Sequence, residues 1–106
     1  MNLANMHCAP GGQAVALDDA TISTHLTTLS GWTRVGNEIQ KTYTFMNYHE
    51  TMAFVNASAW VSHQQDHHPD MGVHYNRCVV AYSTHDAGGI TLNDFICAAK
   101  IEALTK

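Results

Sequence analysis

The chain has 106 residues, of which 45% are hydrophobic and 13% are charged, and its formal net charge is -4. This length allows one domain with one core, and the hydrophobic fraction is typical of a globular protein rather than a disordered one. Because no cluster of Lys and Arg is present to neutralise phosphates, a nucleic-acid-binding role is not predicted. No apolar run approaches the ~20 residues that a membrane-spanning helix needs, so no membrane association is expected.

The three cysteines, Cys8, Cys78 and Cys97, are too few and too widely spaced to form a disulfide framework. This usage is typical of a reducing compartment, and we expect a cytoplasmic protein, with the nucleus as the alternative. The first residues also lack the basic and apolar blocks of a signal peptide. Residues 1–14 contain a proline and two adjacent glycines and show no periodicity, which predicts a loose tail before a single domain over residues 15–106.

The first helix is predicted from about Leu17, capped by Asp18 or Asp19, with apolar residues spaced four and three apart. Gly31 is expected to end it. Two strands over 32–35 and 38–45 follow, joined by a two-residue hairpin turn at Gly36 and the asparagine after it.

The second helix is predicted over 48–67, because Asn47 and Glu50 resemble a helix-start box and Pro69 ends the helical pattern. His67 is thus expected to be its last residue, with His68 outside it. The inward-facing residues are expected to be Ala53, Ala57, Trp60, Val61 and Gln64, with Phe54 beside them.

A second hairpin is predicted with strands over 73–75 and 78–84 and a turn at residues 76–77. Thr91 is expected to cap a last helix, with Asp94 at its third position. The inward-facing residues of that helix are expected to be Leu92, Phe95, Ile96, Ala99 and Leu104.

The predicted order of helix, hairpin, helix, hairpin, helix indicates an α+β fold. We expect a two-layer sandwich, in which a four-stranded antiparallel sheet carries three helices on one face (α-β-β-α-β-β-α). Open sheet edges can pair with another copy of the chain, so a homo-oligomer is expected, either a dimer or a tetramer.

The chain has eight histidines, and three of them fall in the stretch "HQQDHHP" over residues 63–69. His63 and His67 are four residues apart and share a face of the predicted helix. His85 follows the last predicted strand. Because a strand end can lie beside a helix end, we expect His67, His68 and His85 to converge.

Three interpretations of these histidines are open at this point. A pair spaced by four can bind zinc, but no H-E-x-x-H or C-x-x-C motif accompanies it, so no metal site is predicted. The histidines can also be ordinary surface or hydrogen-bonded groups, and Asp94 can be only a helix cap. Acid–base catalysis explains more, since imidazole titrates near neutral pH and a helix C-terminus raises the pKa of a nearby histidine.

The spaced motif resembles that of the pterin-4a-carbinolamine dehydratases. The family pattern has an acidic residue or His, three residues, His-His-Pro, an aromatic residue after five more, His after nine and Asp after eight. Here it is met, with every spacing kept, by His63, His67, His68, Pro69, Tyr75, His85 and Asp94. The resemblance covers residues 17–104, and the predicted order of elements agrees with the fold of the family.

The resemblance implies an enzyme that dehydrates 4a-hydroxytetrahydrobiopterin to quinonoid dihydrobiopterin, which recycles a pterin cofactor, and it implies no metal or organic cofactor. It assigns acid–base roles to His67 and His85, and substrate holding with support of catalysis to His68. Residues expected to line the substrate site are Asp66, His68, Pro69, Ser83 and Thr84. His63 and Asp94 are expected to lie behind the site or to be structural, with Asp94 mainly a helix cap.

Two positions depart from the pattern of the family. His63 stands where many members have a glutamate, so a carboxylate that would raise a neighbouring histidine pKa is lost. Met71 and Gly72 stand where a tryptophan is common, which predicts a less aromatic pocket wall. The alternative function is a dimerisation or transcription-factor-binding module, because some relatives bind a transcription factor. In that case the outer face of the second helix, with Met52, Asn56 and Ala59, would bind the partner.

Overall fold

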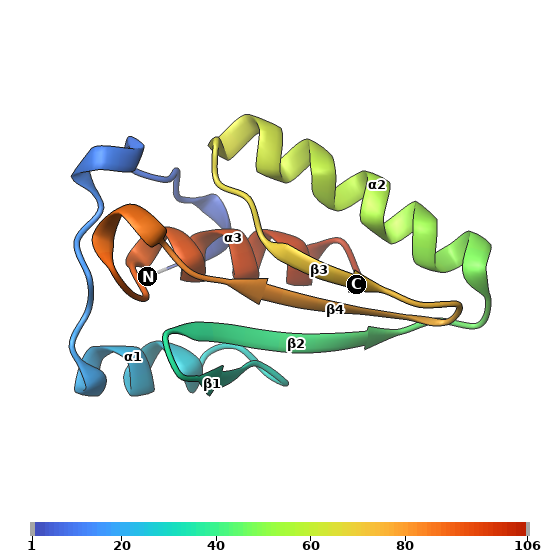
Figure 1. Ribbon diagram of the computed structural model, residues 1–106, viewed down its shortest axis with the longest axis horizontal. Coiled ribbons are helices and arrows are strands. Elements are labelled where there is room, and N and C mark those ends of the chain that lie inside the picture. Colours follow the sequence, from blue (N-terminus) through green and yellow to red (C-terminus); the bar gives the residue numbers. More distant parts are fainter. Residues whose placement is uncertain (1, 106) are drawn as a thin grey trace.

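The computed structural model describes residues 2–105 and has the predicted α+β architecture (Figure 1). Its helices are α1 (Asp19–Leu26), α2 (Tyr48–Gln65) and α3 (Leu92–Ala103), and its strands are β1 (Thr33–Val35), β2 (Glu38–Thr44), β3 (Asp70–Val73) and β4 (Arg77–Tyr82). Three short 3-10 helices are η1 (Leu3–Asn5), η2 (Gly11–Gln13) and η3 (His85–Ala87). The order of helices and strands along the chain confirms the prediction.

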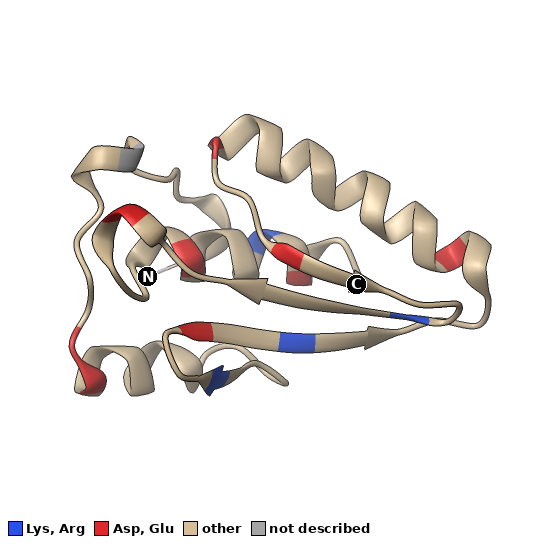
Figure 2. Ribbon diagram, viewed as in Figure 1, with Lys and Arg blue, Asp and Glu red and all other residues tan. Residues whose placement is uncertain are grey.

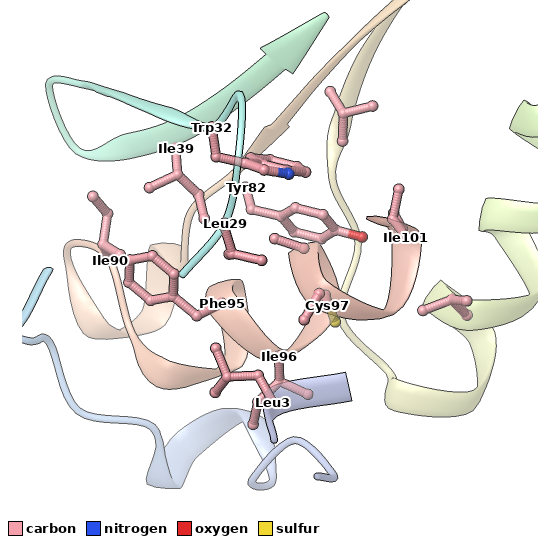
Figure 3. Close-up of a cluster of buried hydrophobic side chains, with 14 of the residues drawn as sticks. Leu3, Leu29, Trp32, Ile39, Tyr82, Ile90, Phe95, Ile96, Cys97 and Ile101 are labelled. Atoms are coloured by element: carbon pink, nitrogen blue, oxygen red, sulfur yellow. The ribbon is translucent and has the colours of Figure 1, made fainter. Parts of the chain in front are cut away.

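The four strands form one antiparallel sheet in the order β1-β2-β4-β3. In the central pair, Ile39 lies opposite Tyr82 and Tyr43 lies opposite Cys78. These four side chains share one face of the sheet and are buried, whereas the alternate residues of β2 and β4 are at least partly accessible. Figure 3 shows the buried sheet residues directed toward α3, so the core lies between this face and the helices.

The start of α1 and the first hairpin follow the prediction, but the end of α1 does not. The Asp18 carboxylate accepts a hydrogen bond from the Thr21 backbone N–H at 2.8 Å, and Val35 pairs with Glu38 across a two-residue turn in which Gly36 has φ +59°. The helix ends at Leu26, so the expectation that Gly31 ends it was wrong. Residues 27–31 form further turns, and Gly31 instead supplies a positive φ of 85° before β1.

The helix α2 begins as predicted, because the Asn47 side chain accepts from the Glu50 N–H at 2.9 Å. Its end was predicted wrongly. The helix stops at Gln65, and Asp66 takes a left-handed conformation with φ 50°, so His67 lies outside the helix. The helix therefore ends at the left-handed Asp66 rather than at Pro69, and both His67 and His68 belong to the loop that leads into β3.

The predicted inner stripe of α2 was confirmed at Val61 and at Phe54 beside it, which are both buried, but it was wrong at its other positions. Four of its members are exposed, namely Ala53, Ala57, Trp60 and Gln64, while the buried residues are Thr51, Phe54, Ser58, Val61 and Ser62. The buried hydroxyls are satisfied locally, since Ser58 donates to the Val55 carbonyl at 2.7 Å and Ser62 to the Ser58 carbonyl at 3.2 Å. Such hydroxyls can be buried at low cost, so an apolar pattern alone points to the wrong face.

The second hairpin lies earlier along the chain than predicted. Its first strand is β3 (Asp70–Val73), and residues 74–76 form the turn that the sequence placed at 76–77. The His74 N–H donates to the Arg77 carbonyl at 2.9 Å, which closes this turn. Because β4 ends at Tyr82, Ser83 and Thr84 leave the sheet and are free to shape a loop.

The helix α3 begins as predicted, with the Asp94 carboxylate accepting the Thr91 N–H at 2.8 Å. Leu104 was expected to face inward, but the helix ends at Ala103 and 42% of Leu104 is exposed. The N-terminal residues were expected to be loose. Instead residues 3–9 lie against α3, with Leu3 buried beside Ile96 (Figure 3), and the Lys100 ammonium donates to the Ala4 carbonyl at 2.9 Å.

Charged residues are dispersed over the part of the chain that the structure describes (Figure 2). The basic residues lie on separate elements, with Arg34 on β1, Lys41 on β2, Arg77 on β4 and Lys100 on α3. Lys41 is paired with Glu102, with its Nζ 2.5 Å from Oε1 of that carboxylate. Among residues 2–105, no helix is both long and apolar enough to cross a membrane.

Candidate active site

The ends of three elements meet at one pocket of about 270 Å³. The pocket is lined by Asp66, His67, His68, Ser83, Thr84, His85, Asp86 and Asn93. The first three follow α2, the next four follow β4, and Asn93 lies in the first turn of α3. Six of the residues that the sequence singled out therefore share one cavity, although they come from two segments of the chain.

Local backbone geometry places the histidines. The His67 N–H donates to the Ser62 carbonyl at 3.2 Å, and the left-handed Asp66 directs the chain away from the α2 axis. On the other side, the Thr84 N–H donates to the Gly89 carbonyl at 3.0 Å and the Gly89 N–H donates back at 3.3 Å. This closed loop contains η3 and holds His85 at the rim of the pocket.

The best-defined interaction in the site joins His67 to Asp94. The His67 Nε2 atom lies 2.6 Å from Oδ1 of Asp94, whose side chain is fully buried. The other carboxylate oxygen accepts from the Thr91 N–H at 2.8 Å and from the Thr84 hydroxyl at 3.0 Å. Because the Thr84 proton is used in this bond, the Thr91 hydroxyl must donate in the 2.8 Å contact between the two threonines. Asp94 is therefore fixed on both oxygens.

This partner changes the acid–base behaviour of His67. Burial alone would lower the His67 pKa, but the hydrogen bond and the negative charge of Asp94 outweigh it, and the pKa is raised above its ordinary value. The ring also stacks on Tyr82, with centroids 5.7 Å apart and planes 14° from parallel. The orientation of the imidazole is thus fixed, and with Nε2 bound by Asp94, Nδ1 is the nitrogen left for a substrate.

His68 and His85 are exposed and line the same pocket, so both are accessible to a substrate. Of the residues expected to line the site, one lies elsewhere. Pro69 is not part of the pocket lining. His63 is exposed on α2, where its ring lies 6.0 Å from that of Trp60, and it does not line the pocket either.

Asp94 does more than the helix capping expected of it, because the same carboxylate both caps α3 and binds His67. Met71 does not line this pocket: its sulfur lies 3.9 Å from the Ser58 hydroxyl of α2, and the side chain packs against the core.

Sequence reasoning missed Asp86 and Asn93 as lining residues and Tyr82 as the platform beneath His67. Asp86 could have been predicted, because it directly follows His85, which was already a predicted site residue. No sequence signal marked Tyr82 or Asn93. The stacking of Tyr82 on His67 and the approach of Asn93 on α3 both depend on tertiary packing. Among residues 2–105, no group of three His, Cys, Asp or Glu side chains is arranged to hold a metal ion.

The fold and the pocket define an α+β protein with a histidine–aspartate site suited to proton transfer. The sequence model of the pterin 4 alpha carbinolamine dehydratases matches residues 15–104. A protein of Chromobacterium violaceum assigned as a pterin-4-alpha-carbinolamine dehydratase is 64% identical over 104 residues, which cover 98% of this chain and 96% of the relative. One from Stenotrophomonas maltophilia with the same assignment is 50% identical over 107 residues, covering 98% and 92%. The chain belongs to this family and is a dehydratase.

Solved structures agree with the fold. The crystal structure of a transcriptional coactivator/pterin dehydratase from Brucella melitensis matches with a TM-score of 0.83 and 28% identity, covering 86% of this chain and 99% of that one. A pterin dehydratase-like protein described as a RuBisCO assembly factor in the alpha-carboxysome matches with a TM-score of 0.57 and 22% identity. The second match covers 69% of this chain and 84% of that one, and it concerns the fold alone.

Proposed function

We propose that this chain eliminates water from a 4a-hydroxytetrahydropterin, such as 4a-hydroxytetrahydrobiopterin, to give the quinonoid dihydropterin. The observation that supports this most is the pocket in which His67, His68 and His85 meet, with His67 held by the buried Asp94. The reaction would return an oxidised pterin cofactor to a form that can be reduced again. Histidines alone supply the protons, so the proposal requires no metal or organic cofactor.

The chemistry needs one acid and one base. The C4a–O bond breaks as the hydroxyl takes up a proton and leaves as water, the N5–H bond breaks, and its electrons form the C4a=N5 double bond. In our proposal His67 is the acid, because Asp94 favours its protonated form. His85 is the base that accepts the proton from N5, since it lies on the opposite segment of the pocket and is exposed.

The remaining lining residues would hold the pterin ring. His68 contacts the substrate, and Asp66 and Ser83 offer polar groups to the amide edge of the ring. The Thr84 hydroxyl is already engaged with Asp94 and Thr91, so Thr84 would contribute through its backbone. Because Pro69 and His63 lie outside the lining, we assign them no contact with the substrate.

The test is a spectrophotometric dehydratase assay with single-histidine variants. We expect His67→Ala and His85→Ala each to lower kcat by roughly 10²–10⁴-fold, the usual contribution of a positioned acid or base. His63→Ala is the matched control, since this histidine is exposed outside the pocket, and it should retain wild-type activity. Wild-type rates in both site variants would refute the assignment of the site.

We also propose that the protein acts in the cytoplasm as a homo-oligomer, a dimer or a tetramer. The support is the exposed apolar surface of α2, where Tyr48 is 52% and Trp60 is 62% exposed, together with the open edges of β1 and β3. Light scattering after size-exclusion chromatography measures the mass directly. A monomer at all concentrations would contradict this proposal without bearing on the dehydratase assay.

A further inference from the structure

Two cysteine sulfurs are in contact beside the candidate active site. The Cys8 Sγ atom lies 3.5 Å from that of Cys97, although the two residues are 89 positions apart in the chain. Cys97 lies in α3 and is fully buried, whereas Cys8 lies between η1 and η2 and is partly accessible. A buried thiol in contact with an accessible one is the arrangement in which oxidation of the second can be passed to the first.

The backbone around Cys8 is held in place on both sides of the sulfur. The Cys8 N–H donates to the side-chain oxygen of Gln65 at 2.8 Å. The next residue, Ala9, exchanges two hydrogen bonds with the side chain of Asn93, one of 2.9 Å from its N–H and one of 3.0 Å to its carbonyl. The contact between the sulfurs therefore results from fixed packing of the N-terminal segment on α2 and α3.

We propose that Cys8 and Cys97 are a redox-active pair that hydrogen peroxide converts into an intrachain disulfide. The Cys8 thiolate attacks one peroxide oxygen, the O–O bond breaks, and Cys8 becomes a sulfenic acid while hydroxide leaves. The Cys97 sulfur then attacks the Cys8 sulfur, the S–O bond breaks, and water leaves. Two thiols lose two electrons and two protons, and the peroxide is reduced to two water molecules.

The surroundings of the two thiols support this order of events. Cys8 is the accessible partner, and its pKa is lowered because the hydrogen bond from Cys97 outweighs its partial burial, with His67 and Lys100 adding positive charge nearby. The same hydrogen bond and burial raise the pKa of Cys97. Closing the bond needs an approach of roughly 1.5 Å, which is small enough to come from rotation of the two cysteine side chains with a slight shift of the backbone at Cys8.

The cysteine pair is coupled to the candidate active site through two neighbouring residues, Asn93 and His67. Asn93, which holds Ala9, also lines the pocket. The charge of Cys8 is one of the contributions that raise the His67 pKa, and a disulfide would remove it. Oxidation would therefore fasten the N-terminal segment to α3 and change the electrostatics next to His67. The inference does not depend on which reaction the pocket catalyses.

Peptide mapping of the native protein tests the proposal. The reduced protein is treated with hydrogen peroxide, the oxidant is removed with catalase, and remaining thiols are alkylated in denaturant. Trypsin leaves Cys78 and Cys97 in one peptide, but Asp-N cleavage before Asp86 and Asp94 separates them. We expect the Cys8 and Cys97 peptides to be joined in most chains, the Cys78 peptide to be alkylated, and the linkage to disappear with dithiothreitol.

Variants sharpen the result. With Cys97→Ser, peroxide should drive Cys8 on to sulfinic acid without any crosslink, because no partner thiol remains. Cys78→Ala is the matched control and should form the Cys8–Cys97 linkage as the wild type does. The proposal is overturned if wild-type Cys8 and Cys97 are both recovered alkylated, or if Cys8 is over-oxidised while Cys97 stays free. The wild-type map decides this even if a variant fails to fold.

Discussion

Asp94 is the residue on which the candidate site most depends. Its side chain is fully buried, yet it accepts hydrogen bonds from three different parts of the chain: the loop after α2, the loop after β4 and the N-terminus of α3. A buried carboxylate is stable only when such partners compensate its lost hydration. Because one of these partners is His67, the helix cap also sets the protonation of the proposed acid.

The variant Asp94→Asn tests this coupling. An amide keeps the shape of the side chain but removes the charge, so burial would dominate and the His67 pKa would fall. We expect the limb of the pH–rate profile that reports His67 to move to lower pH, with kcat at neutral pH reduced by at least about tenfold. The profile of kcat against pH and an NMR titration of His67 measure this.

A structural defect alone would lower activity at all pH values without moving that limb. His63→Ala serves again as the control, and its profile should match that of the wild type. An Asp94→Asn profile with an unchanged limb would show that the carboxylate does not set the protonation of His67.

At this scale the sequence was informative because the spacing of the motif is specific. It identified Asp66, His67, His68, Ser83, Thr84 and His85, which all line the pocket. It could not predict that Asp94 reaches His67, since they are 27 residues apart and meet only when α3 packs beneath the loops. Nor could it place Cys8 beside Cys97, because no local pattern marks that contact.

Among the elements, the C-terminus of α2 controls where the histidines point. Asp66 takes φ 50° at the position where helices usually end in glycine, a conformation that costs most L-residues about 1–2 kcal/mol. Aspartate tolerates this conformation better than most residues, and Asp66 lines the pocket. The choice of aspartate thus combines a helix stop with a polar wall.

Substitutions of Asp66 test the first of these roles, the helix stop. Asp66→Gly should raise the free energy of unfolding by about 0.5–1 kcal/mol, because glycine adopts this conformation without strain. Asp66→Val should lower it by about 1–2 kcal/mol, because a β-branched residue does not. Urea denaturation measures both. Equal stability of the two variants would contradict the strained left-handed turn.

The buried face of α2 gives a second test at this scale. Phe54 is 6% exposed and packs between Tyr43 and Phe45, with ring centroids 4.7 and 5.3 Å away. Phe54→Ala should therefore lower the free energy of unfolding by about 3–5 kcal/mol. Gln64→Lys, on the stripe that the sequence wrongly placed inside, should stay within about 0.5 kcal/mol of the wild type. A loss of several kcal/mol of unfolding free energy in Gln64→Lys would instead indicate that Gln64 is buried, as the sequence predicted.

Helix starts and the inner face of α3 at Phe95, Ile96 and Ala99 were predicted correctly, whereas the ends of α1 and α2 and most of the inner face of α2 were not. The caps at Asp18, Asn47 and Asp94 depend on hydrogen bonds within four residues, which a sequence pattern captures. The end of α2 and its buried serines depend instead on a strained backbone and on tertiary packing. The shifted second hairpin has the same origin, because the register of β3 is set by its pairing with β4.

For the whole molecule, two partly buried charge pairs, His67 with Asp94 and Lys41 with Glu102, predict a limited pH range of stability. His67 has a raised pKa, so its contribution is complete below the ordinary histidine value of 6.5 and is lost as the pH rises through its folded pKa. For Glu102, burial opposes the shift, but hydrogen bonds from Lys41 and Tyr43 lower its pKa. Its contribution is present above the ordinary value and is lost as the pH falls through the folded pKa.

We therefore expect thermal unfolding to give the highest Tm on the mildly acidic side of neutrality, with a decline in both directions. Asp94→Asn should flatten the decline above pH 6.5, and Glu102→Gln should flatten the decline in acid. Differential scanning calorimetry across the pH range measures this. A wild-type Tm that keeps rising above neutral pH would contradict the assigned contribution of His67.

The position of α3 after all four strands has a consequence for biosynthesis. This helix supplies Asp94, the partner of His67, and it adds Phe95, Ile96, Cys97 and Ile101 to the core. At translation speeds of about 5–20 residues per second, the stretch from the end of β4 to the end of α3 takes on the order of 1–4 s to make. During that interval the apolar face of the sheet lacks the cover of α3. A nascent chain without α3 is thus a natural client for chaperones, and it gains the carboxylate partner of the proposed acid only after the sheet is complete.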